Sequence, residues 1–136
     1  MTTAMPLTLE HRCDHDLAVV VLAGEIDVAT SAGLREDLAR LVASGARHLI
    51  LDLGAVAFID SSGLSVLLSF HHHLGGRHGS IVLAAVNQRI REVLRVTQLT
   101  RIFPIYGTAE VAIQAHHATR TGPDTSRTPP RDRDAN

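Results

Sequence analysis

Apolar residues follow two spacings along this chain, one typical of strands and one typical of helices. Strand-like runs occupy residues 7–13, 17–23, 48–60, 80–86 and 102–106. Apolar residues at helical spacing follow each of the last four runs. This order predicts an α/β fold, with one mixed sheet of about five strands and about four helices.

The strands are predicted to differ in burial. The run 48–60 is apolar almost throughout, the pattern of a central strand covered on both faces. Residues 7–13 alternate instead, which predicts a half-buried strand paired antiparallel with 17–23, with Cys13 as a small buried side chain. Pro104 interrupts the last run, so that strand is expected at the edge of the sheet.

The most informative stretch is the junction Asp60-Ser61-Ser62-Gly63-Leu64, where an apolar strand meets an apolar helix. We expect the two serines to lie at the helix N-terminus, where unpaired backbone N–H groups and the helix dipole favour side-chain oxygens. A phosphate added to such a hydroxyl meets an anion-binding site. The junction therefore suits a hydroxyl that is modified or touched by a partner.

A second strand-to-helix junction follows Ile26. Asp27 is expected to cap the first helix, which Gly45 would end. In open α/β sheets the carboxyl ends of parallel strands form the working edge, so Asp27 and the serine junction are candidates for the same edge. Whether the two loops adjoin depends on strand order, which the spacing of residues leaves open.

Length and composition predict one domain without general affinity for polyanions. The 136 residues divide into a flexible start at 1–6, a domain at 7–118, and a disordered tail at 119–136 that is nearly free of apolar residues. A net charge of -1 argues against nucleic-acid or membrane binding. With no leader pattern and no apolar run near ~20 residues, a soluble, cytoplasmic protein is expected.

Three segments closely resemble the STAS domain of bacterial anti-sigma-factor antagonists: Gly-Glu-Ile-Asp at 24–27, the junction at 60–64, and the stretch 93–106. The likeness covers about residues 7–117 and implies a single STAS-like domain. Two positions depart from the family pattern. Ser65 stands where glycine is common, and Gln98 replaces a glycine usual after the third helix, so that turn is expected to be strained or differently capped.

The resemblance implies a binding switch controlled by phosphorylation. In this family the unphosphorylated antagonist binds an anti-sigma factor, usually also a serine kinase of the GHKL type, and so frees a sigma factor for transcription. The kinase modifies the serine directly after the aspartate, here Ser61, and a PP2C-type phosphatase restores it. No cofactor is expected, because ATP and magnesium belong to the kinase. By position, the partner-binding edge consists of Asp27, Asp60, Ser62, Gly63 and Leu64.

The same residues are also compatible with other roles. A serine at a helix start is most often only a cap, so we assign capping to Asp60 or Ser62 and phosphate acceptance to Ser61. Asp27 is left open as a cap, a partner contact, or both. The runner-up function is a STAS subunit of a lipid-transport ABC assembly or a ligand-sensing module, neither controlled by phosphorylation.

Enzymatic and metal-binding functions are not expected. The serines lack the Gly-x-Ser-x-Gly pattern of a hydrolase, and no Gly-x-x-x-x-Gly-Lys loop is present. His71, His72 and His73 are consecutive on a helix and point about 100° apart, so they do not form one metal site. Arg89, Arg91 and Arg95 are predicted to be mostly a solvated face of the third helix, with contact to an acidic partner as the alternative.

Overall fold

Five strands form one mixed sheet in the order β1-β2-β3-β4-β5. The structure is a computed structural model that describes residues 7–120. β1 runs antiparallel to β2, and the remaining neighbours pair in parallel, which confirms the predicted mixed sheet. β3 is central, as expected from its nearly continuous apolar run. The strands are β1 Thr8–Asp14, β2 Leu17–Ile26, β3 His48–Ile59, β4 Ser80–Ala84 and β5 Ile105–Tyr106.

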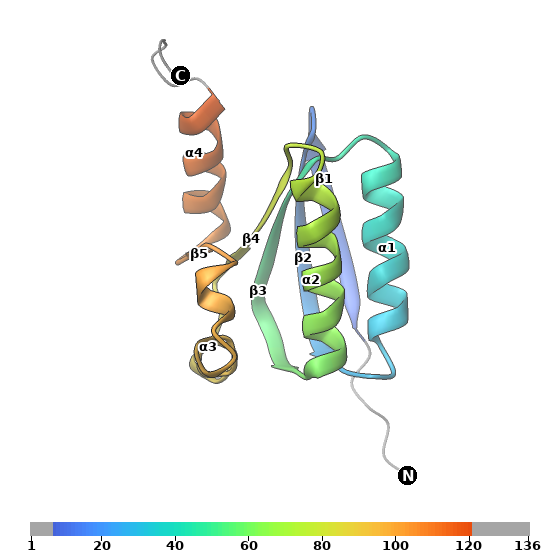
Figure 1. Cartoon of the computed structure of the whole chain (residues 1–136), viewed down its shortest axis with the longest axis vertical. Helices are drawn as coiled ribbons and strands as arrows, with labels where there is room; N and C mark the ends of the chain where they lie inside the picture. The colour runs from blue at the N-terminus through green and yellow to red at the C-terminus, as the bar shows by residue number, and fades with distance from the viewer. Residues whose placement is uncertain (1–6, 121–136) are drawn as a thin grey trace.

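Helices cover the two faces of the sheet unequally (Figure 1). The main core joins one sheet face to α1, α2 and α3, whereas the smaller core on the other face involves α4 alone. The smaller cover leaves Val21 of β2 40% exposed. Among residues 7–120 no helix has the length and apolar character needed to cross a bilayer. The helices are α1 Ser31–Ala43, α2 Ser61–Gly75, α3 Gln88–Val96, the 3-10 turn Leu99–Arg101 and α4 Ala109–Arg120.

Two predictions about β1 are wrong. Every residue of β1 except the partly buried Leu9 is exposed, so the strand is not half-buried, and Cys13 is an exposed thiol rather than a buried side chain. The alternation of residues 7–13 predicts one buried face. β1 lies at the edge of the sheet, where the helices cover little of either face.

The other edge and the last turns follow the sequence more closely. β5 lies at the edge of the sheet, as predicted, but it is only two residues long and begins after Pro104 instead of spanning 102–106. Gln98 adopts a left-handed backbone with φ 64°, which confirms the strained turn expected where a glycine is usual. α4 continues past the expected end at Ala118 to Arg120. The flexible start at 1–6 and the rest of the predicted tail lie outside the described residues.

Candidate functional site

The two strand-to-helix junctions singled out from the sequence lie side by side. β2 and β3 are parallel neighbours, and Ile26 pairs with Ile59 at their carboxyl ends. The backbone N–H of Asp60 donates to the carbonyl oxygen of Ile26 at 3.0 Å, so the loops that follow both strands begin in contact. The loop from β2 to α1 and the loop from β3 to α2 thus lie at the same end of the sheet (Figure 1), which brings Asp27 and Ser61 to one side of the domain.

Asp60 is the N-cap of α2 and fixes the start of that helix. Its carboxylate accepts hydrogen bonds from the backbone N–H groups of Ser62 at 2.9 Å and Gly63 at 3.2 Å. The hydroxyl of Ser62 donates to the same oxygen at 2.5 Å. This hydroxyl, together with the backbone N–H groups of Gly63, Ser62 and Val28, lowers the pKa of Asp60, although burial acts in the opposite direction. Asp60 therefore holds a negative charge directly at the helix start.

Gly63 and Leu64 seat the first turn of α2 on the sheet. A Cβ atom at Gly63 would lie 2.5 Å from Cγ2 of Ile26 and 2.8 Å from Cγ1 of Ile59, closer than packed carbon atoms approach. Leu64 is only 8% exposed and belongs to the main core. Both residues are buried, so they hold the helix in place from beneath.

Ser61 and Ser62 are adjacent but chemically different. Ser62 is partly buried, and its hydroxyl is bound to Asp60. Ser61, the first residue of α2, is exposed, and within residues 7–120 its hydroxyl makes no hydrogen bond. Its oxygen therefore lies at the positive end of a rigid helix and is open to solvent.

Asp27 does not cap α1, which corrects the sequence prediction. Its carboxylate accepts from the backbone N–H groups of Ala29 at 2.9 Å and Thr30 at 3.1 Å, and α1 begins only at Ser31 with Thr30 as its N-cap residue. The Thr30 hydroxyl donates to the carbonyl oxygen of Glu25 at 2.8 Å and closes the turn. Aspartate is favoured in such turns for the same reason as at caps, so the sequence alone did not separate the two.

The turn exposes a hydrophobic side chain that the sequence analysis missed. Val28 is 79% exposed, the highest fraction among the exposed large hydrophobic residues of the described chain. It follows Asp27 directly and lies inside the turn that Asp27 and Thr30 close. An apolar residue inside a turn of polar and small residues was the available signal.

Comparisons with known proteins identify the family of this chain. A family model described as the STAS domain matches residues 8–112. The chain belongs to this family. The anti-sigma-B factor antagonist of Bacillus subtilis is 34% identical over 95 residues, which cover 70% of this chain and 86% of that protein. The crystal structure of an anti-sigma factor antagonist from Mycobacterium paratuberculosis is 30% identical with a TM-score of 0.73, and the match covers 80% of this chain and 92% of that one.

The likeness to a more distant neighbour shows the fold of this STAS domain alone. The anti-sigma factor antagonist SpoIIAA of Bacillus has been solved in an unphosphorylated and a phosphorylated form. The first is 20% identical with a TM-score of 0.73, covering 82% of this chain and 97% of SpoIIAA. The second is 21% identical with a TM-score of 0.66, covering 80% and 99%.

α3 brings an arginine of the STAS domain close to the end of β3. The Asn87 side chain accepts from the backbone N–H of Ile90 at 2.8 Å and donates to the carbonyl oxygen of Val56 at 3.0 Å. It therefore caps α3 and ties it to β3. The Arg89 guanidinium then lies 5.7 Å from the centre of the Phe58 ring, within range of a cation–π contact.

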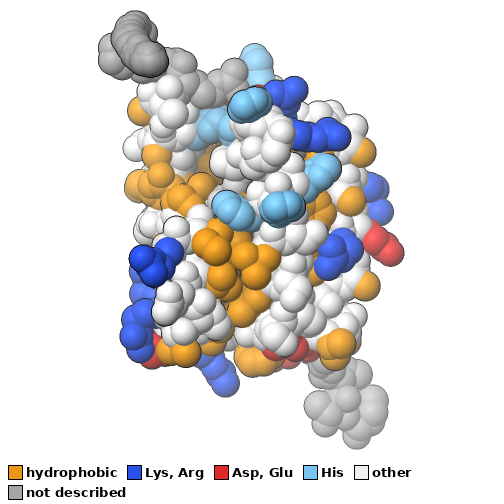
Figure 2. All heavy atoms as spheres, viewed as in Figure 1, with side chains coloured by type: hydrophobic (Ala, Val, Ile, Leu, Met, Phe, Trp, Pro, Cys, Tyr) orange, Lys and Arg blue, Asp and Glu red, His pale blue; other side chains and the backbone are white. Residues whose placement is uncertain are grey.

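The histidines on the face shown in Figure 2 lie away from the start of α2. In Figure 2 they gather over the upper and middle parts of the visible face, whereas α2 begins at the lower end in the same view. His71 packs edge-on against Phe103, with ring centres 5.5 Å apart, and His72 and His73 are exposed. Within residues 7–120 no three side chains of the metal-ligating types converge on one position.

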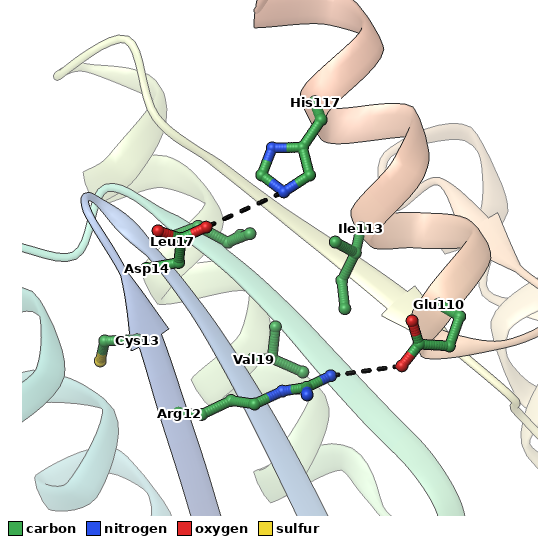
Figure 3. Close-up of a pocket in the computed structure, with 8 residues that line it drawn as sticks. All are labelled: Arg12, Cys13, Asp14, Leu17, Val19, Glu110, Ile113 and His117. Atoms are coloured by element: carbon green, nitrogen blue, oxygen red, sulfur yellow. Dashed lines mark hydrogen bonds and ion pairs between the residues drawn. The ribbon is translucent and has the colours of Figure 1, made fainter.

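A small hollow on the α4 face is separate from the Ser61 edge. It encloses about 240 Å³ between β1, β2 and α4 (Figure 3). Two ion pairs between exposed side chains cross it, Arg12 with Glu110 at 3.4 Å and His117 with Asp14 at 3.9 Å. Its volume lies below the ~300–1,000 Å³ typical of small-molecule sites.

Proposed function

We propose that this STAS domain is an anti-sigma-factor antagonist that is switched by phosphorylation of Ser61. The unphosphorylated form binds an anti-sigma factor through the edge formed by Asp27, Val28, Asp60 and Ser61, and thereby frees a sigma factor. The observation that carries the proposal is the contrast between the two serines. Ser61 is exposed at the start of α2, whereas Ser62 is bound to Asp60. The names of the relatives point to the same class of regulator.

Within the predicted edge, Asp60, Ser62, Gly63 and Leu64 act by positioning. Asp60 and Ser62 form the cap that fixes the helix start, and the buried Gly63 and Leu64 hold the first turn on the sheet. A partner then meets a surface whose backbone is already ordered, which lowers the entropic cost of binding. We assign direct contact to Val28 and Ser61, which are the exposed members of the group.

The charge of the phosphate on Ser61 controls partner binding. A phosphate on Ser61 adds about 1.5 to 2 negative charges at neutral pH. The helix N-terminus accommodates this charge in the free protein, and the phosphorylated form of SpoIIAA keeps a fold similar to that of this chain. In a complex the phosphate would be desolvated beside the ionised Asp60, and an unmatched buried charge costs several kcal/mol. The partner is released while the domain stays folded.

The chemistry of modification belongs to other proteins. We infer that the anti-sigma factor is also a serine kinase of the GHKL type, which brings ATP and magnesium, and that a PP2C-type phosphatase reverses the reaction. The domain itself acts by binding and carries out no catalysis. It works in the cytoplasm, where sigma factors are found, without direct contact to nucleic acid or membrane.

The test is incubation of the chain with ATP and each candidate kinase of the organism, followed by mass spectrometry. We expect one added phosphate on Ser61. Ser62→Ala is the matched variant, because it removes the neighbouring hydroxyl and leaves the acceptor, and it should still be modified. Ser61→Ala should remain unmodified. A wild-type chain that no kinase of the organism modifies would refute the switch and favour a STAS module that is not controlled by phosphorylation.

A further inference from the structure

The two outer strands of the sheet, β1 and β5, differ in length and regularity. β5 is two residues long, follows Pro104 and packs against α4, so it offers little backbone for pairing. β1 spans seven residues without proline and pairs with β2 in unbroken register from Thr8 to Asp14. Within residues 7–120 no strand pairs with its outer side. β1 is therefore a long, regular edge strand whose outward backbone groups are open to pairing.

The sequence of β1 is complementary to itself. If two copies pair antiparallel about His11, Glu10 lies opposite Arg12 of the second copy, and Arg12 lies opposite its Glu10. Leu9 then faces Cys13, and Thr8 faces Asp14. We propose that β1 is a homodimer interface, in which two copies of the domain join their sheets through this strand.

Charges on an edge strand usually prevent association, but here their order has the opposite effect. Opposite charges directly across an antiparallel pair are attractive, and like charges there are repulsive. Arg12 reaches towards α4 and Cys13 leaves β1 on the other side (Figure 3). Because side chains alternate along a strand, Glu10 shares the face of Arg12, and Leu9 shares the face of Cys13. The dimer would thus have ionic pairs on one face and apolar pairs on the other.

The contacts that β1 already makes do not block this pairing. Arg12 binds Glu110 of α4 at 3.4 Å, but both side chains are more than half exposed, so the bond is weak and readily exchanged. A two-fold axis through His11 would join the five strands of each copy into one continuous sheet. Ser61 follows β3, two strands away from the new contact, so each copy would keep its partner-binding edge free.

The test uses the mass of the full chain in solution, measured by sedimentation over a concentration series. The wild type is expected to approach twice 14.6 kDa. Glu10→Arg places only arginines, and Arg12→Glu only glutamates, at positions 10 and 12, so each variant alone should dimerise about tenfold more weakly or worse. An equimolar mixture of the two variants should dimerise again, because every cross-strand pair is then attractive.

Two controls separate dimerisation from folding. Glu110→Gln removes the intrachain partner of Arg12 and should leave the dimer unchanged. Circular dichroism should show that each variant is folded. The proposal is overturned by a wild type that stays monomeric throughout the series, by single variants that associate like the wild type, or by a mixture that stays monomeric.

Discussion

The loops that follow β2 and β3 start from paired residues at the same end of the sheet, yet they are built in different ways. After Ile59 a single residue, Asp60, separates the strand from α2. After Ile26 four residues intervene before α1 begins at Ser31. An aspartate follows each strand, but only Asp60 caps a helix, whereas Asp27 closes a turn.

The short junction holds the Ser61 backbone in a fixed position, and the longer loop exposes the Val28 side chain. In the short junction only Asp60 lies between β3 and α2, so the backbones of this strand and this helix fix the position of the Ser61 hydroxyl. The longer loop has room to turn Val28 outward, and its hydrogen bonds hold that turn closed. Substitutions at Asp60 and Gly63, which position the first turn of α2, should therefore alter stability, whereas a substitution at Val28, in the longer loop, should alter binding.

The largest effect on stability is expected from Gly63→Ala. The added methyl group would meet Ile26 and Ile59 at 2.5 and 2.8 Å, and overpacking of this kind costs about 1–3 kcal/mol. Gly33→Ala is the matched control, because it adds the same methyl group inside α1 with no atom within 4 Å. It should stabilise the domain by about 1 kcal/mol. Urea unfolding measures both changes, and equal effects of one sign would contradict the packing described for α2.

The second effect concerns binding at the longer loop. Val28→Asp replaces the most exposed large hydrophobic side chain by a charge and should weaken binding of the anti-sigma factor about tenfold or more, because an unmatched charge would be buried in the complex. Its stability should change by less than about 0.5 kcal/mol. Val111→Asp, on the exposed side of α4, is the control and should bind normally. Normal binding of the Val28 variant would exclude this loop from the interface.

The third effect is the loss of the α2 cap in Asp60→Ala, expected to lower the free energy of unfolding by about 1 kcal/mol at neutral pH. Because folding lowers the pKa of Asp60, the charged form is the stabilising one. The difference between wild type and variant should therefore be full above the usual aspartate range and shrink as pH falls through the folded value. Glu36→Ala, on an exposed part of α1, is a control outside the cap. A difference that grew on acidification would contradict the assigned hydrogen bonds.

Much of this architecture was predictable, because the local signals agreed with one another. The apolar run of β3 ends directly at a residue that caps well, so the boundary between Asp60 and Ser61 could be placed from the sequence. Pro104 in the same way located the edge strand β5. The adjacency of the two junctions was not predictable, since it depends on which strands are neighbours and not on the spacing of residues.

The wrong predictions concern residues and patterns that occur in more than one local structure. Asp27 satisfies the sequence pattern of a cap, and only the path of the chain from β2 to α1 determines that it closes a turn. The alternation in β1 matched a half-buried strand, but burial depends on what packs over the sheet edge, which the strand itself does not encode. Cys13 was misplaced for the same reason.

In the proposed switch, charge on Ser61 releases the partner without unfolding the domain. The decisive measurement is calorimetric titration of the anti-sigma factor with the unmodified chain and with the chain phosphorylated on Ser61. We expect the unmodified form to bind and the affinity of the phosphorylated form to be lower by about 100-fold or more, as several kcal/mol of unmatched charge requires. Equal affinity of the two forms for the anti-sigma factor would contradict this switch.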